Sequence, residues 1–372
     1  MKKNLRNILA VALGLMTTVA FAQTWNADSR TRIDMSGDHD KMSTSQRATI
    51  GATWGGDDWG IHVSSDFNYM LGDATTDAET GERVLSANIY EAYASTNVMG
   101  YANVTVGRQA LNYGSGMILS SNDWANNRTV WDGFTVDLGV DLADITIGYA
   151  SRTNDATGEL DANGDMDNEM SGNTMYANVG KADGDWSVNL LILNSGTELN
   201  GEETSSLSAM GLDLTYALMG GDLGLGLSYN TATAEAGDNS TDMDMMDISA
   251  SYQINDDFSV TAGQATYGEE GFTMGGTDFS GGLAGSGQLG YLAANDENMY
   301  VGVDYGMGDF SMGLTMNMIG NSEDDDYERT VNAFNLGYAM SDNANLGLSW
   351  ASDKENDDDA LNYMWVTLNI TP

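Results

Sequence analysis

Residues 57–72 read DDWGIHVSSDFNYMLG, and alternate positions of this stretch carry different kinds of side chain. One parity is apolar and the other polar: Trp59, Ile61, Val63, Phe67, Tyr69 and Leu71 against His62, Ser64, Asp66 and Asn68. Successive side chains of a β-strand point to opposite faces of the sheet. The stretch therefore predicts a strand with one apolar face and one polar face.

The same alternation recurs along most of the chain. We count about eighteen such segments between residues 24 and 371, with sixteen as the lower alternative. Residues 310–318 are a second clear case, because Met312, Leu314 and Met316 alternate with glycine, threonine and asparagine. The chain is therefore expected to be all-β.

The connections between these segments alternate between short and long. Short ones include residues 55–58 and 306–308, whereas residues 153–172, 321–328 and 352–360 form long acidic connections. Transmembrane β-barrels have short periplasmic turns and long extracellular loops. A closed barrel also pairs every backbone group that lipid would otherwise leave unsatisfied. We therefore predict an antiparallel transmembrane barrel, with a soluble β-sandwich or β-solenoid as the rival.

The first 22 residues have the features of an export signal. Lys2, Lys3 and Arg6 precede a mostly apolar stretch, and residues 20–22 read Ala-Phe-Ala, which fits a small-residue cleavage site. We expect residues 1–22 to be a signal peptide and residues 23–372 to form one barrel domain. This placement predicts the outer membrane of a bacterium.

Composition excludes several classes of function. The chain has 372 residues, 55 acidic and 14 basic, with a formal net charge of −41 and no cysteine. The charge disfavours nucleic acid as a partner, because nucleic acid requires a basic face. The absence of cysteine excludes disulfide scaffolds, cysteine nucleophiles and thiolate metal sites.

Aromatic residues occur near the ends of the predicted strands. They suit the two interfacial girdles of a membrane barrel, although β-propensity alone would also enrich them. The candidates are Trp25, Trp54, Trp59, Trp131, Trp186, Tyr216, Tyr229, Tyr252, Tyr305, Tyr338 and Trp350.

The few basic residues concentrate in the N-terminal part of the chain. Arg30, Arg32, Arg47 and Arg152 share the polar parity of their segments, and a charge facing lipid at mid-membrane would cost about 2–4 kcal/mol. They are therefore predicted to face the lumen. Together with Asp66 and Glu91 they would either form a charged wall that screens permeants or brace the wall as a structural network.

Residues 107–138, GRQALNYGSGMILSSNDWANNRTVWDGFTVDL, resemble the signature of the alginate export family of outer-membrane barrels. The similar elements are Gly107-Arg108-Gln109, Tyr113-Gly114, Trp124, Asn127-Arg128 and Trp131-Asp132-Gly133. The resemblance implies an eighteen-stranded channel, passage of an anionic polysaccharide and pore-side positions for Arg108 and Arg128. With these, the predicted pore-lining set is Arg30, Arg32, Arg47, Asp66, Arg83, Glu91, Arg108, Arg128 and Arg152.

The sequence contains no clear motif for catalysis or for cofactor binding. The only histidines are His39 and His62, and no spacing builds a Ser-His-Asp site around either. The run from Asp161 to Asp167 resembles part of a calcium loop but lacks its sixth-position glycine. We predict no enzyme, no cofactor and no dedicated metal site, although divalent cations could bind the acidic loops loosely.

We therefore expect a porin-like channel for passive diffusion of small hydrophilic or ionic solutes. One alternative is an anionic polysaccharide exporter of the alginate export type, for which eleven basic residues beyond residue 22 are few. Another is a non-conducting barrel for adhesion or envelope structure. The channel and the structural barrel differ in what residues 110–130 and 268–297 do. Partial narrowing of the lumen would support a selective channel, and complete plugging would favour the structural barrel. Expected partners are outer-membrane lipids, lipopolysaccharide and small solutes, and a homotrimer is an open alternative for the assembly.

Overall fold

The structure is a computed structural model. It describes residues 22–37, 42–72, 86–140, 142–155, 169–199, 202–274, 282–283 and 289–371. The expected signal peptide, apart from Ala22, lies outside these ranges, as do His39, Arg83 and the run from Asp161 to Asp167.

The eighteen predicted strands are confirmed, in the predicted order. They are β1 (Ala22–Asp34), β2 (Ser43–Gly55), β3 (Trp59–Met70), β4 (Ser86–Val98), β5 (Ala102–Gln109), β6 (Trp131–Val140), β7 (Ala143–Asp155), β8 (Glu169–Asp183), β9 (Trp186–Leu199), β10 (Glu202–Leu218), β11 (Leu223–Ala236), β12 (Asn239–Asn255), β13 (Phe258–Tyr267), β14 (Asp296–Met307), β15 (Phe310–Asn321), β16 (Asp324–Ser341), β17 (Ala344–Glu355) and β18 (Leu361–Ile370).

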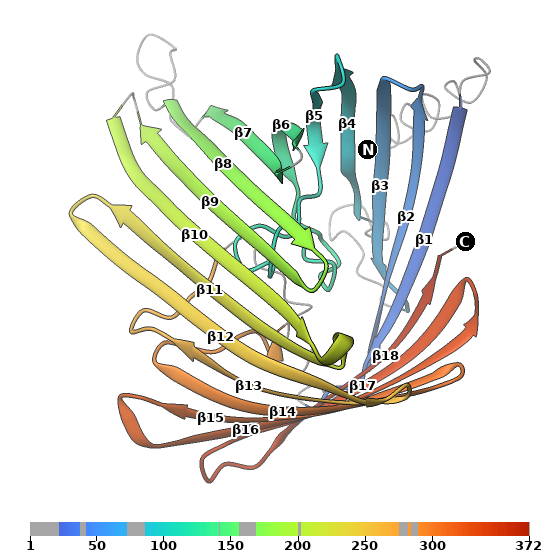
Figure 1. Ribbon diagram of the computed structural model, residues 1–372, viewed down its shortest axis with the longest axis vertical. Helices are drawn as coiled ribbons and strands as arrows, with labels where there is room; N and C mark the ends of the chain where they lie inside the picture. The colour runs from blue at the N-terminus through green and yellow to red at the C-terminus, as the bar shows by residue number, and fades with distance from the viewer. Residues whose placement is uncertain are drawn as a thin grey trace.

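The strands form one closed antiparallel barrel (Figure 1). Each strand pairs with its neighbours in sequence, and β1 pairs with β18 from Ser29↔Ile370 to Asp34↔Trp365. Closure gives every described strand a partner on both sides, so the sheet has no edge strand, which is the condition for a sheet to lie in hydrocarbon.

The two faces of the wall have the predicted character. On β3, Ile61 and Val63 are exposed on the outer face, whereas Ser64 and Asp66 are buried in the lumen. On β15, Leu314 is 53% exposed and Asn317 only 5%. A continuous exposed apolar surface of this kind is what a lipid-facing barrel presents.

Two acidic stretches predicted as long loops belong to strands, the first largely and the second in part. Residues 324–328 are the first residues of β16, so only Ser322 and Glu323 connect it to β15. Similarly, β17 continues to Glu355. The predicted loops 321–328 and 352–360 are therefore wrong in extent, because an acidic strand can keep its backbone ladder where its side chains lie in water.

One long connection, and the described part of a second, fold inward. The connection between β5 and β6, residues 110–130, lies inside the ring of strands in Figure 1 and is called here the inward loop. Its residues Met117 and Ile118 share one buried apolar cluster with Phe272 and Leu292 from the β13–β14 connection.

Among the described residues, no helix has the length and apolar character needed to cross a membrane.

Candidate functional site

The inward loop begins where β5 stops early. β5 has 8 residues, whereas its partner β4 has 13. β5 pairs with β4 only up to Arg108, which lies opposite Ala92, so the chain leaves the wall there and continues into the lumen. Leu111, Met117 and Ile118 of this loop are buried, so the loop has an apolar underside that packs against inward side chains of the opposite wall.

Tyrosine rings support the loop from the β7–β8 side. Tyr176 of β8 is 3% exposed, and its hydroxyl lies 3.0 Å from that of Tyr113 in the loop. The Tyr176 ring lies across Gly148 of β7, where an added Cβ would come within 2.0 Å of the ring. Trp131 also packs edge-on against Tyr176, with ring centroids 5.4 Å apart. Its assignment to an interfacial girdle is therefore wrong, whereas Trp59 and Trp186 are exposed on the outer face.

The tip of the loop is fixed to β10. The backbone nitrogen of Ser115 donates to the Asp213 carboxylate at 2.9 Å. Gly114 has a φ of +56°, and a Cβ at this position would lie 2.0 Å from an Asp213 oxygen. Glycine is required there for its backbone conformation and for this close approach.

Arg30 and Arg47 hold the returning half of the loop against β1 and β2. Arg30 donates to the carbonyls of Asp123 at 2.5 Å and Ala125 at 3.1 Å, and to Asn126 Oδ1 at 2.8 Å. Arg47 donates to the same two carbonyls at 3.1 and 2.9 Å. Both arginines are buried, with 7% and 6% exposure. These predicted pore residues lie in the lumen, but the loop covers them.

Arg32 completes this set of contacts. Its guanidinium donates to the carbonyl of Trp124 at 3.0 Å and lies 4.3 Å from the centroid of the Trp124 ring. The tryptophan that contributed to the family resemblance therefore packs against an arginine through a cation–π contact.

Arg128 and Asp66 form a buried ion pair. Two guanidinium nitrogens of Arg128 donate to the two carboxylate oxygens of Asp66 at 3.0 and 2.6 Å, and the guanidinium lies over the ring of Tyr90. The side chains are 9% and 4% exposed. Burial lowers the pKa of Arg128, but its hydrogen bonds to Asp66 and the nearby carboxylates outweigh burial and hold that pKa above its usual value.

A β-bulge in β4 produces part of this site. Ser64 pairs with Glu91 and Ser65 with Ile89, so Tyr90 is the extra residue. The bulge directs both Tyr90 and Glu91 into the lumen, which regular alternation would not do. Glu91 accepts a hydrogen bond from the backbone nitrogen of Ala110 at 3.2 Å, at the start of the inward loop.

His62 is part of the wall next to Glu91. Its Nε2 lies 3.6 Å from a Glu91 oxygen, its Nδ1 lies 2.7 Å from Thr53 Oγ1, and its ring stacks on Tyr93. A catalytic triad would place a serine at a ring nitrogen. Threonine and glutamate occupy those positions instead. Among the described residues, no group of three acidic or histidine side chains is arranged to hold a metal ion.

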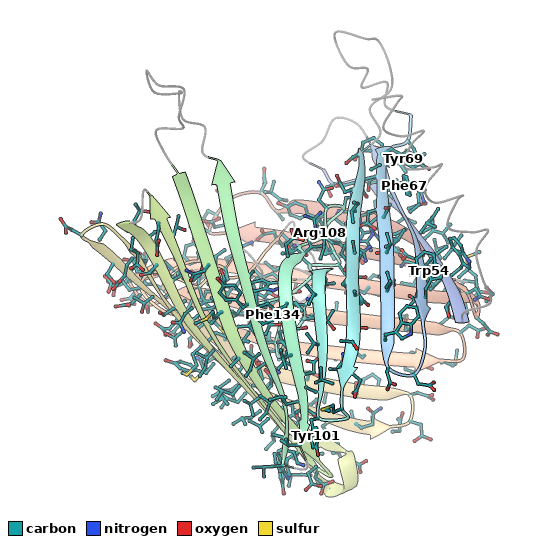
Figure 2. The ribbon with its side chains drawn as sticks, turned by 90° about the horizontal axis from the view of Figure 1, so that it is seen from above. Trp54, Phe67, Tyr69, Tyr101, Arg108 and Phe134 are labelled. Atoms are coloured by element: carbon teal, nitrogen blue, oxygen red, sulfur yellow. The ribbon has the colours of Figure 1, made fainter. Side chains whose placement is uncertain are left out.

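Arg108 lies outside the lumen, contrary to the pore-side position that the resemblance implied. It shares its face of β5 with Val106, which is 55% exposed, and its guanidinium donates to both oxygens of Asp132 at 2.7 and 2.6 Å. Figure 2 labels Arg108 on the wall formed by β2 to β6. Gly107 has a φ of +130° but keeps the strand register, so Arg108 is not turned inward. Arg152 lies on β7, and Arg83 lies outside the described residues.

The open space of the lumen lies against the opposite wall. A cavity of about 460 Å³ is bounded by the loop residues Ser115 and Met117, by Leu283 and Leu292, and by strands β11 to β16. The wall contributes mostly uncharged polar groups: Ser228, Asp247, Asn298, Tyr300, Asn317 and Asn335. These residues were not among the predicted pore residues, because the prediction was based on charged side chains. Their positions on the polar parity of the strands could have identified them.

The cavity continues toward the short turns. It shares Thr315 and Asn335 with a second cavity of about 430 Å³, which is also lined by Asp257 and Asp304. The inward loop therefore divides the lumen into a side filled by arginine contacts and a side that stays open.

This architecture is found in known proteins. Residues 15–152 match the family model described as alginate export. The resemblance inferred from residues 107–138 is confirmed. No curated protein matches the chain in sequence.

Solved structures of outer-membrane proteins share the fold over almost the whole chain. The Pseudomonas aeruginosa protein OpdK, crystallised with vanillate, has a TM-score of 0.68 at 12% identity, with 95% of this chain and 100% of that chain covered. Acinetobacter baumannii OccAB4 has a TM-score of 0.68 at 12% identity, covering 94% and 98%. OccK8 (OprE) of P. aeruginosa has a TM-score of 0.65 at 13% identity, covering 94% and 98%. At these identities the likeness establishes the fold.

Proposed function

We propose that the chain is an outer-membrane channel for passive diffusion of small hydrophilic solutes. The observation that carries this proposal is the open cavity between the inward loop and β11–β16, inside a closed barrel with an apolar outer face. The two inward connections narrow the lumen, and the cavity remains beside them. A passage narrowed in this way selects by size and by lining chemistry.

The proposal places the barrel among lipids and lipopolysaccharide of the outer membrane. Exposed aliphatic and aromatic side chains such as Ile50, Ile248 and Trp186 would contact hydrocarbon and its interfaces. The fold shared with outer-membrane proteins supports this location.

Reconstitution into planar lipid bilayers tests the channel directly. We expect discrete, ohmic conductance steps in potassium chloride and permeation of small neutral sugars into loaded vesicles. Protein that inserts but gives no conductance at any salt concentration would contradict the channel and favour a structural or adhesive barrel.

The family match favours export of an anionic polysaccharide as the second candidate. A polyuronate conduit needs accessible cations, yet Arg30 and Arg47 are buried under the inward loop, and Arg128 of that loop is buried against Asp66. Block of the single-channel current by oligouronates, but not by neutral oligosaccharides of the same length, would support this candidate over the diffusion channel.

A further inference from the structure

Asp247 is the only charged side chain among the described residues that line the main cavity. It lies on β12, and one of its carboxylate oxygens accepts a hydrogen bond from the Tyr300 hydroxyl at 3.0 Å. No Lys, Arg or His belongs to this part of the lining. The local field is therefore negative and attracts cations.

Gly263 fixes the position of the Tyr300 ring. A Cβ at Gly263 would lie 2.3 Å from the Tyr300 ring and hydroxyl, so the ring rests directly on the backbone of β13. Because the ring cannot move into the wall, its hydroxyl holds the Asp247 carboxylate in one orientation. This is the arrangement expected of a binding group whose geometry is set before the ligand arrives.

Asn298 presents an unpartnered acceptor to the same cavity. The Asn317 amide donates to the Val331 carbonyl at 3.2 Å, which leaves the Asn317 oxygen to accept from the Asn298 amide at 2.9 Å. These two bonds fix the orientation of both amides. The Oδ1 atom of Asn298, a residue only 3% exposed, therefore has no partner among the described residues.

Tyr267 adds a second buried polar atom without a described partner. Its side chain is 6% exposed, lines the same cavity, and its hydroxyl makes no hydrogen bond within the described part of the chain. Buried polar groups in folded proteins are normally satisfied, so this hydroxyl, like the Asn298 oxygen, is available to water or to a solute in the cavity.

Part of the remaining lining is apolar. Met117 from the inward loop, Met245 from β12 and Leu292 from the β13–β14 connection all contribute to the cavity. A solute with an apolar body would therefore find contact surface within the same space as the carboxylate.

We infer that this cavity is a selectivity site for small organic cations. An ammonium or guanidinium group would lie near Asp247 and the Asn298 oxygen, with the apolar part of the solute against Met117 and Leu292. The inference rests on the proposed channel function and names its substrate class. It assigns selection to β12–β14, on the wall opposite the arginines.

Phenethylammonium and phenylacetate test this inference, because they match in size and differ in charge. We expect the wild-type channel to pass the ammonium faster in vesicle uptake assays. Asp247→Asn should lower the ratio of ammonium to carboxylate permeability about fivefold, the size expected when one charge is removed from a partly desolvated site. Asp242→Asn is the matched control, because it removes the same charge from β12 near that strand's outer end, away from the cavity lining.

Block of the single-channel current in the wild type provides a readout that needs no variant. Phenethylammonium should block the potassium current saturably, and phenylacetate should not. If the channel conducts but shows neither charge discrimination nor block, the inference is overturned, and the proposed channel function remains supported. Absence of conductance in the wild type would instead overturn the proposed function.

Discussion

Replacing Arg30 and Arg47 together by glutamine is expected to raise the single-channel conductance about two- to fourfold, because the returning half of the inward loop would detach from β1 and β2 and open that side of the lumen. The two guanidinium groups donate five hydrogen bonds to residues 123–126 of the loop. Hydrogen bonds from charged donors contribute about 1.5–3 kcal/mol each. Glutamine is shorter and uncharged, so most of this attachment is lost.

Arg329→Gln is the matched control for this double variant. Arg329 pairs with Asp353 through two hydrogen bonds at 2.8 and 2.7 Å and lies on β16, away from the inward loop. Its removal should leave the conductance close to the wild-type value. If the double variant conducts like the wild type with the same current noise, the arginines do not hold the loop.

Asp66→Ala should destabilise the barrel by about 3–5 kcal/mol, because it leaves the buried Arg128 guanidinium with only the exposed Asp123 carboxylate, at 3.3 Å, as a counter-charge. Arg128 and Asp66 are 9% and 4% exposed, so water does not replace the lost partner. The effect is measured by urea unfolding in lipid vesicles, together with the single variant Arg128→Ala.

The double variant Asp66→Ala/Arg128→Ala provides the internal control. It removes both charges, so we expect it to be more stable than Asp66→Ala alone, with a coupling energy of about 2–3 kcal/mol. Additive effects of the two single substitutions would show that the ion pair does not contribute as a unit.

Alternation alone predicted most of the fold. In β3 and β15 apolar residues occupy most positions of one parity, interrupted in β3 by Ser65. Such a strand is stable in a closed barrel that has lipid outside and polar groups inside. The acidic hairpins were harder to predict. Residues 324–328 read as a loop by composition, yet they extend β16, because charge does not prevent a strand from continuing where it is solvated.

The site could be predicted only in part. The parity of Arg30, Arg47 and Asp66 placed them in the lumen, but parity does not reveal which loop covers them. The bulge at Tyr90 and the outward face of Arg108 depend on strand register, which one sequence does not specify. The open side of the lumen was missed because uncharged residues such as Asn298 and Asn335 give weaker signals than arginines.

Thiol accessibility tests the central claim, that the open passage follows β11–β16 while the arginine side is filled. The chain has no cysteine, so single cysteines can be introduced at Ser228 or Asn335 on the cavity wall and at Ser64 on β3. A charged methanethiosulfonate reagent applied to open channels should reduce the current of the first two variants within seconds and leave Ser64→Cys unchanged. Fast modification at residue 64, with none at 228 and 335, would contradict the account.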